Sequence, residues 1–214
     1  NNACKNVDFV LHQAALGSVP RSIINPHATH FNNVDTFLNV LLFSKKASVK
    51  RLVYASSSSL YGNSKKLPKI EGNEGDLLSP YAATKKINEI YAQTFSKTFG
   101  LEAIGLRYFN VFGPRQDPNG QYAAVIPKWI KAIYENKPIT IFGDGKTTRD
   151  FCYVKNAVQA NLLSALSRND DAINKSYNIA CGSQITLNQL AETIERELKI
   201  IKSEIFMQKS FKDF

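Results

Sequence analysis

The sequence lacks the cysteine pattern of a metal site or of a disulfide framework. Its three cysteines stand at positions 4, 152 and 181 without the spacing of metal ligands, and an odd number argues against a set of disulfides. The three histidines form no ligand constellation either. We therefore expect no bound metal and a reducing compartment.

Two further absences limit the class of protein. The sequence contains neither a signal peptide nor an apolar run of about 18 residues, so we expect no membrane partner and a cytoplasmic location. It also lacks a long basic tract. The formal net charge is +9, but the lysines are scattered, in pairs such as Lys45-Lys46 and Lys65-Lys66. Because nucleic-acid-binding domains concentrate positive charge, we expect no nucleic-acid partner.

The order of the expected elements indicates the fold class. Of the 214 residues 43% are hydrophobic, which is enough to bury a sizeable core. Strands are expected at 7–11, 50–55 and 103–107, and helices at 33–47, from Pro80 onward, and at 122–136, 154–167 and 187–199. This alternation is typical of a parallel α/β sheet. The loop after Pro114 is the expected domain boundary.

A tyrosine and a lysine are spaced as one would expect in a catalytic pair. Ser79 is a good N-cap and Pro80 a good first helical residue, so Tyr81 falls in the first turn of a helix and Lys85 one turn later on the same face. An ammonium group beside a phenol lowers the pKa of the phenol from about 10 and makes it a usable base. The same spacing also occurs by chance in many helices.

The segment before this helix favours the functional interpretation. A β-rich run at 50–55 ends in four serines, Ser56 to Ser59. A buried strand with a hydroxyl-rich tip is typical of the carboxyl end of a parallel sheet, where open α/β folds bind ligands. The alternative is an ordinary flexible loop.

Five segments together resemble the extended short-chain dehydrogenase/reductases that act on nucleotide sugars. They are residues 10–15, the serine run closing with Tyr61-Gly62, residues 79–85, residues 106–114, and Gly143-Asp144-Gly145 followed by Arg149-Asp150-Phe151. The resemblance implies NAD as cofactor and a Rossmann-type doubly wound parallel sheet in residues 1–113. It also implies a smaller substrate domain in residues 114–214, with segments near 148–168 returning to the first domain.

One part of the family pattern is missing. These enzymes open with a strand, a Gly-x-x-Gly-x-x-Gly turn and a helix, whose amides and dipole hold the pyrophosphate. Here Gly17 is the only glycine before Gly62, and polar residues 1–6 lead directly into the strand at 7–11. We interpret that strand as the fourth of the sheet. We therefore expect this chain to be truncated at both ends and inactive alone, and the full-length protein to be a homodimer.

The resemblance also implies roles for individual residues. Tyr81 corresponds to the base that takes a proton from a sugar hydroxyl, and Lys85 to the residue that lowers its pKa and binds the nicotinamide ribose. Ser57 corresponds to the hydroxyl that orients the same sugar oxygen. The other positions near the cofactor are Gln13, Ala14, Ala15, Asn32 and Phe109. The positions near the nucleotide sugar are Ser18, Ser57, Ser58, Asn110, Ala124, Val125 and Arg149.

For two of the positions near the nucleotide sugar, a purely structural role is the alternative to substrate binding. Arg149 corresponds to the arginine that grips the diphosphate, for which a planar guanidinium offers paired donors. A surface salt bridge is the alternative for Arg149. For Asn110, which resembles a diphosphate or sugar contact, the alternative is a turn residue.

The residues beside the serine tip indicate the type of reaction. Dehydratases and decarboxylases of the family commonly carry an acidic residue two or three positions before the Tyr-Gly pair, and here Ser58 and Ser59 occupy those positions. Serine is a poor general acid, so the resemblance favours 4-epimerisation through a 4-keto sugar, which needs only reversible oxidation.

Segments 14–22 and 115–120 most resemble the branch of bacterial polysaccharide enzymes that prefer UDP-N-acetylhexosamines. The expected function is UDP-N-acetylglucosamine 4-epimerisation for surface polysaccharide biosynthesis. The alternatives are a UDP-glucose or UDP-glucuronate 4-epimerase, a related decarboxylase or dehydratase, and a non-catalytic dinucleotide-binding relative.

Overall fold

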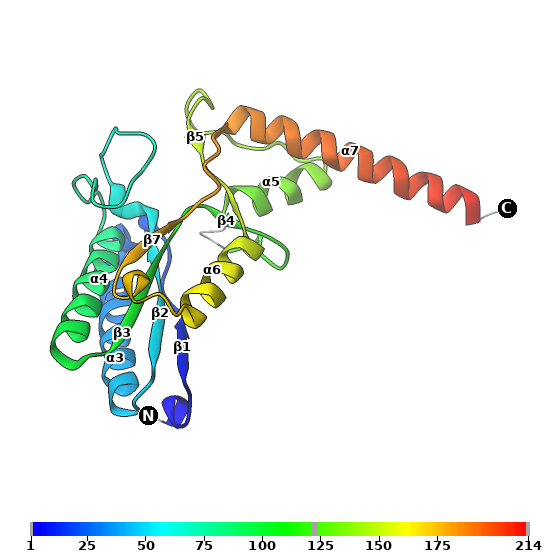
Figure 1. Ribbon diagram of the computed structural model, residues 1–214. Coiled ribbons are helices and arrows are strands. Elements are labelled where there is room, and N and C mark those ends of the chain that lie inside the picture. The colour runs from blue at the N-terminus through cyan, green and yellow to red at the C-terminus, as the bar shows by residue number, and fades with distance from the viewer. Residues whose placement is uncertain (1, 121–123, 213–214) are drawn as a thin grey trace. The chain divides into compact units, whose positions relative to one another are not determined.

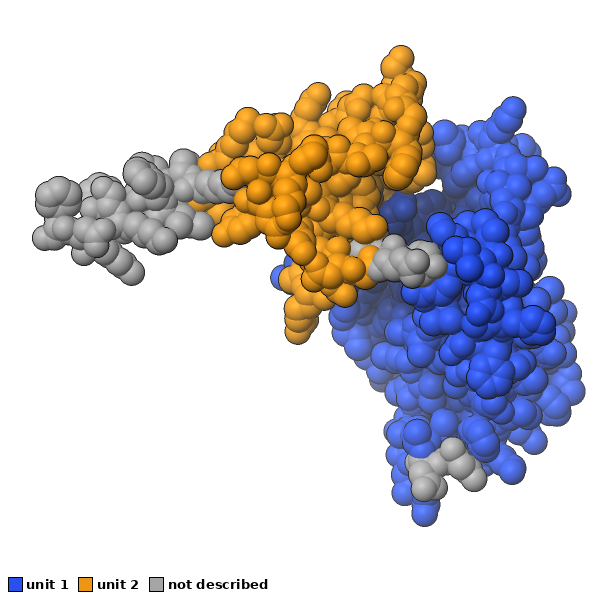
Figure 2. All heavy atoms as spheres, turned by 180° about the vertical axis from the view of Figure 1, so that it is seen from behind, with its two compact units in different colours: residues 1–111, 152–180 blue, residues 112–151, 181–214 orange. Residues whose placement is uncertain are grey.

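The computed structural model describes residues 2–120 and 124–212, which divide into two compact units (Figure 2). The first unit contains residues 1–111 and 152–180, and the second contains residues 112–151 and 181–214. The assignment of cofactor binding to residues 1–113 and of substrate binding mainly to residues 114–214, with segments near 148–168 returning, stays a prediction.

A parallel sheet of four strands forms the centre of the first unit (Figure 1). Its order is β1 (Phe9–His12), β2 (Arg51–Ser57), β3 (Glu102–Tyr108) and β7 (Ser176–Ile179). Val53 lies opposite Ile104, and Ser57 lies opposite Tyr108. Because the strands are parallel, their carboxyl ends meet at one edge of the sheet. The strand expected at 50–55 starts at Arg51 and continues through the first two serines of the run, to Ser57.

Helices cover both faces of this sheet. One face carries α3 (Thr36–Lys46) and α4 (Pro80–Phe99), and the other carries α6 (Val154–Leu166) (Figure 1). On the first face Phe37 and Leu41 of α3 pack with Leu52 of β2, and all three side chains are fully buried. Each such burial contributes about 1.5–3 kcal/mol. On the second face Val53 and Ile104 pack against Ala165 of α6. The predicted doubly wound α/β sheet is confirmed.

Short helices complete the first unit. They are η1 (Asn2–Cys4), α1 (Val19–Ile24), α2 (Pro26–His30), the π-helical turn η2 (Phe31–Asp35), η3 (Ser58–Tyr61) and η4 (Asp170–Ala172). The α-helix expected at 33–47 thus starts later, at Thr36, because the preceding residues form a π-helical turn.

The second unit is built around two helices. It contains α5 (Val125–Tyr134), the antiparallel pair β5 (Thr148–Arg149) and β8 (Ile185–Thr186), and α7 (Leu187–Lys212). Ile126 and Trp129 of α5 pack against Leu190 of α7. The helix expected at 187–199 continues to Lys212, since no glycine or proline follows to end it. Of the helix expected at 122–136, residues 122 and 123 lie outside the described residues.

Two short strands stand where the chain passes between the units. They are β4 (Val111–Phe112) and β6 (Cys152–Tyr153). Within residues 2–120 and 124–212, no helix has the length and apolarity to cross a bilayer. The same residues contain no group of three side chains suited to hold a metal ion.

Candidate active site

A cavity of about 470 Å³ opens at the carboxyl ends of β1, β2 and β3 in the first unit. It brings together many of the site residues expected from the sequence. These are Gln13, Ala15, Ser57, Ser58, Tyr81, Lys85, Phe109 and Asn110. The carboxyl edge of a parallel sheet is where open α/β folds bind ligands. The cavity is therefore the candidate active site.

Helix α4 carries Tyr81 and Lys85 into the cavity, and its start follows from local sequence. Ser79 is the N-cap, and its hydroxyl accepts a hydrogen bond from the amide of Ala82 at 3.1 Å. Pro80 is the first helical residue, and Gly100 ends the helix in a left-handed conformation with φ of 69°. Tyr81 and Lys85 therefore lie one turn apart on the face that lines the cavity.

Lys85 is almost fully buried, and its ammonium is held by the sheet. Lys85 Nζ donates to the carbonyl oxygen of Ala55 in β2 at 2.8 Å. Burial lowers the pKa of Lys85 to about 8, because an ammonium loses hydration inside the protein. Burial and the charge of Lys85 together lower the pKa of His12, at the end of β1, to about 4. His12 is thus a neutral imidazole, and it lies against the ring of Phe37.

The pKa of Tyr81 corrects one expectation from the sequence. We expected Lys85 to lower it, but burial raises the pKa of Tyr81, and the interaction that opposes burial is a side-chain hydrogen bond with Ser57. The physical reason is that burial removes hydration from the phenolate, and Lys85 is not among the groups that shift this pKa. An ammonium has three N–H donors, and Ala55 uses one of them.

Ser57 is the last residue of β2 and is fixed by the turn that follows. Its hydroxyl caps η3 by accepting a hydrogen bond from the amide of Ser59 at 3.2 Å. Gly62 ends η3 with φ of 46°, and a Cβ placed there would lie 1.8 Å from the carbonyl oxygen of Asp76. Glycine is therefore required where this turn meets the segment before α4. Ser58 lines the cavity, and the buried Ser59 hydroxyl has no partner among the described residues.

The segment after β1 is held by an asparagine that the sequence analysis missed. Asn33, fully buried in η2, accepts from the amide of Leu16 at 2.7 Å and donates to the Leu16 carbonyl at 3.2 Å. It also donates to Thr84 of α4 at 3.1 Å. The predicted cofactor residue Asn32 lies outside the cavity lining, and its side chain donates to the carbonyl of Ala28 on the helix surface.

A triangle of hydrogen bonds fixes the cavity wall near Gln13. Gln13 donates to Asn161 of α6 at 2.9 Å, Asn161 donates to the Tyr108 hydroxyl at 2.6 Å, and that hydroxyl donates to Gln13 at 2.9 Å. The triangle joins the segment that follows β1 to β3 and α6. Asn161 was not expected from the sequence, because nothing in its local pattern marks it.

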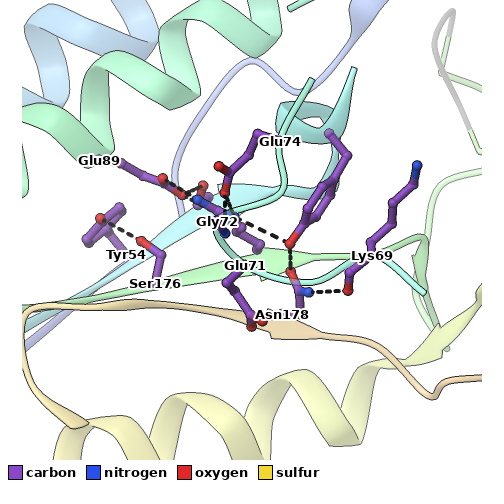
Figure 3. A network of polar contacts seen from close by, with 11 residues as sticks. Tyr54, Lys69, Glu71, Gly72, Glu74, Glu89, Ser176 and Asn178 are labelled. Carbon is purple, nitrogen blue, oxygen red and sulfur yellow. Dashed lines mark hydrogen bonds and ion pairs between the residues drawn. The ribbon is translucent and has the colours of Figure 1, made fainter. Parts of the chain in front are cut away.

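A buried ionic network lies next to the serine tip, between β3 and α4 (Figure 3). Arg107 donates to Glu89 through two hydrogen bonds, from Nε at 2.9 Å and from Nη2 at 2.8 Å. Its Nη1 atom contacts Glu74 and the hydroxyl of Tyr61. Burial disfavours the charged form of Arg107, but the hydrogen bonds and charge of Glu89 raise its pKa above the ordinary value.

The network also reaches β7 and the segment before α4. The Tyr61 hydroxyl donates to Asn178 at 2.7 Å, and Asn178 donates to the carbonyl of Lys69 at 2.9 Å. Burial raises the pKa of Glu74, but its hydrogen bonds with Arg107 and Gly72 lower it overall. The sequence analysis missed Glu89, although it follows Lys85 at the same four-residue spacing as Lys85 follows Tyr81.

The remaining expected residues lie outside the cavity lining. Ala14 is exposed, and Ser18 is the buried N-cap of α1, accepting from the amide of Arg21 at 3.2 Å. Ala124, Val125 and Arg149 belong to the second unit. There Arg149 is exposed and donates to the Thr148 carbonyl at 3.0 Å.

The residues of the cavity fit a cofactor that has both apolar and hydrogen-bonding groups. Phe109 and Val111 offer apolar surface, while Ser57, Tyr81 and Lys85 offer hydroxyl and ammonium groups at one wall. Gly17, which also lines the cavity, has nothing within 4 Å of the position of an added Cβ, so the backbone is open to close approach. Apolar walls with a few converging polar groups are typical of cofactor sites.

The chain is similar to known proteins over most of its length. The NAD dependent epimerase/dehydratase family matches residues 1–180. The UDP-glucuronate 4-epimerase of Thermodesulfobacterium geofontis is 38% identical over 192 residues, which are 89% of this chain and 57% of that protein.

Two solved structures are similar as well. The UDP-N-acetylglucosamine 4-epimerase from Methanobrevibacter ruminantium, in complex with UDP-N-acetylmuramic acid, is 43% identical with a TM-score of 0.88, covering 92% of this chain and 63% of that one. The UDP-glucose 4-epimerase of Thermotoga maritima, with UDP-glucose, is 35% identical with a TM-score of 0.83, covering 88% and 60%. This chain thus spans less than two thirds of each relative's length.

Proposed function

The chain belongs to the NAD dependent epimerase/dehydratase family, and on that premise we propose that the whole protein is an NAD-dependent 4-epimerase of UDP-sugars. The observation that carries the proposal is the convergence of Ser57, Tyr81 and Lys85 on one cavity at the carboxyl edge of the sheet. A hydroxyl, a phenol and an ammonium at one wall can orient a sugar hydroxyl and accept its proton.

The chemistry assigned to the chain is proton transfer at the 4-hydroxyl of the sugar. Tyr81 Oη accepts the proton while Ser57 Oγ orients the sugar oxygen. Lys85 has two further N–H donors besides the one bound to Ala55, and these are available to bind the ribose next to the nicotinamide. Bound NAD would supply the reversible oxidation at C4, and inversion would follow from hydride return to the opposite face of the 4-keto sugar. In the return step, Tyr81 gives its proton back to the new hydroxyl.

The serines beside Ser57 favour epimerisation over dehydration. A dehydratase needs an acid to expel water from the keto sugar, and neither Ser58 nor Ser59 can supply one. Ser58 lines the cavity as a neutral hydroxyl. The residues at this wall therefore support reversible oxidation and reduction without elimination.

We propose UDP-N-acetylglucosamine and UDP-N-acetylgalactosamine as the substrate pair, in the biosynthesis of a surface polysaccharide. One support is the resemblance of segments 14–22 and 115–120 to enzymes that prefer UDP-N-acetylhexosamines. The other is the 43% identity to a UDP-N-acetylglucosamine 4-epimerase. Asn110, at the cavity, and Arg149, in the second unit, are the proposed contacts to the sugar and diphosphate. The homodimer and the cytoplasmic location stay predictions.

UDP-glucuronate is the second candidate substrate. The specific observation that favours it is the 38% identity to a UDP-glucuronate 4-epimerase over 192 residues. The residues at the cavity would act on C4 of either sugar in the same way, so they do not separate the two candidates.

The test is an assay of the purified whole protein with NAD and, separately, UDP-N-acetylglucosamine, UDP-glucose and UDP-glucuronate. Proton NMR of the products would identify a 4-epimer. We expect kcat/KM to be highest for the N-acetylated sugar. A higher value for UDP-glucuronate would support the second candidate. A 4-keto-6-deoxy product would overturn the epimerase proposal, and the lack of any product would favour a non-catalytic dinucleotide-binding protein.

A further inference from the structure

Three consecutive residues at the end of β2 interact with three successive turns of α4. The carbonyl of Ala55 accepts from Lys85, the hydroxyl of Ser56 donates to Glu89 Oε1 at 2.6 Å, and Ser57 interacts with Tyr81. Two of these contacts involve residues of the proposed catalytic machinery. The middle contact involves a pair of residues to which the proposed chemistry gives no role.

The middle contact is buried and rigid. Ser56, Glu89 and Arg107 each expose no more than 5% of their surface. Ser56 and Arg107 are direct neighbours on β2 and β3, and both bind the Glu89 carboxylate. A carboxylate held by two parallel guanidinium bonds has a fixed orientation. The Glu89 carboxylate therefore holds the side chain of Ser56 in a defined position on β2.

A buried ion pair needs a reason beyond stability. The cost of removing both charges from water roughly cancels their attraction, and a well-packed apolar pair is often as stable. The guanidinium also contacts Glu74 through Nη1, so it is bound to the segment before α4 as well as to Glu89. These contacts would keep α4 in a fixed position relative to the end of β2.

We propose that Glu89 is a positioning residue that acts through Ser56 to hold Ser57 against Tyr81. The importance of this role for turnover rests on the proposed function, in which Tyr81 is the base. A displacement of about 1 Å between reacting groups can cost about 10²-fold in rate. The Ser56–Glu89 hydrogen bond lies one residue before Ser57, whose hydroxyl orients the sugar oxygen in the proposed function.

A direct readout of this geometry is the ionisation of Tyr81. The Ser57 hydrogen bond lowers the pKa of Tyr81, so the loss of that bond should raise it. The other ionisable side chains that line the cavity are Lys85 from α4 and Tyr108 from β3. A further ionisable group is His12 at the end of β1, whose pKa is lowered in part by the charge of Lys85. None of these three is altered in the variants below.

The experiment replaces Tyr81 by a ring-fluorinated tyrosine in the whole protein and follows its fluorine NMR signal against pH. We expect the midpoint to move to higher pH in Ser56→Ala and in Glu89→Gln. Neither variant should move it further when Ser57→Ala is already present. Ser56→Ala is the gentler change, because Glu89 keeps both bonds to Arg107. It carries the test if Glu89→Gln does not fold.

Glu102→Gln is the matched control. Glu102 of β3 pairs with the buried Arg51 of β2, so this ion pair joins the same two strands at their other end. Its loss should reduce stability and leave the fluorine midpoint unchanged. In turnover assays with unlabelled protein, Ser56→Ala should lower kcat about 10-fold and change KM less than about 2-fold.

The outcomes separate this inference from the proposed function. An unchanged midpoint in Ser56→Ala would overturn the inference, as would an equal shift with Ser57→Ala already present. A shift of the fluorine midpoint in Glu102→Gln would overturn it too, because the midpoint would then respond to any loss of stability between β2 and β3. A wild-type protein that epimerises no UDP-sugar would contradict the proposed function alone, since the fluorine titration needs no turnover.

Discussion

The ammonium of Lys85 lies 2.8 Å from the carbonyl oxygen of Ala55, so the helix that carries the proposed base is bound directly to the strand that ends in Ser57. This contact sets the depth of the lysine in the cavity. It also means that the lysine side chain has a structural partner independent of any ligand. Its side chain nonetheless lines the cavity, where its remaining N–H donors are available to a ligand.

Tyr81→Phe tests the base. The change removes the phenol oxygen and keeps the ring, so we expect kcat to fall by at least about 10²-fold with little change in substrate affinity. Tyr91→Phe on the same helix is the matched control, since Tyr91 packs against the core and is absent from the cavity lining. Steady-state kinetics of the whole protein would measure both. Turnover near the wild-type value in Tyr81→Phe would exclude this residue as the base.

Ser57→Ala and Ser58→Ala test which serine orients the sugar oxygen. Ser57 interacts with Tyr81, whereas Ser58 lines the cavity without that interaction. We expect Ser57→Ala to lower kcat by less than Tyr81→Phe does, because the base stays in place, and Ser58→Ala to have a smaller effect still. If Ser58→Ala were the more damaging change, the assignment of the orienting hydroxyl would be wrong.

The buried Lys85 should make stability depend on pH. Its pKa is about 8 in the folded protein and 10.5 in the reference state, so between these values the unfolded chain binds more protons. Stability must then rise with pH across this window, by up to about 3 kcal/mol. Urea unfolding of cofactor-free wild type and Lys85→Met at pH 7 to 10 would measure it. The free energy of unfolding of the wild type should rise relative to that of the variant as pH rises. A difference that does not change with pH would contradict the prediction.

Asn33→Ala tests the support of the segment after β1. The change leaves the Leu16 amide without its partner at 2.7 Å, and an unsatisfied buried donor costs about 1–3 kcal/mol. We also expect weaker NAD binding, because Ala15 and Gly17 of this segment line the cavity. Calorimetry with NAD and urea unfolding would measure both effects. Asn32→Ala, one residue away and exposed, should stay within about 0.5 kcal/mol of wild type.

The sequence predicted those parts of the site that local patterns determine. Helix α4 could be placed because Ser79, Pro80 and Gly100 act within a few residues of themselves. Tyr81 and Lys85 could be placed because helical periodicity puts them on one face. The serine run at the end of a strand indicated the ligand-binding edge, whereas the choice of Ser57 within that run came from the family resemblance.

Contacts between distant parts of the chain could not be predicted in this way. The Gln13–Asn161 bond joins residues separated by 148 positions, and the Asn33–Thr84 bond joins residues separated by 51. The choice between Asn32 and Asn33 depends on the π-helical turn, which rotates the side chains relative to an α-helix. Glu89 and Arg107 are ordinary charged residues in the sequence, and only the packing of α4 on β3 brings them together as an ion pair.

The chain passes from one unit to the other at 111–112, at 151–152 and at 180–181. The second unit is therefore encoded by two separate segments, 112–151 and 181–214. Neither segment carries the whole core, since Trp129 comes from the first and Leu190 from the second. An exchange of this unit between relatives, by recombination or by engineering, has to replace both pieces together. A chimera that receives only residues 112–151 would pair an α5 from one ancestor with an α7 from another.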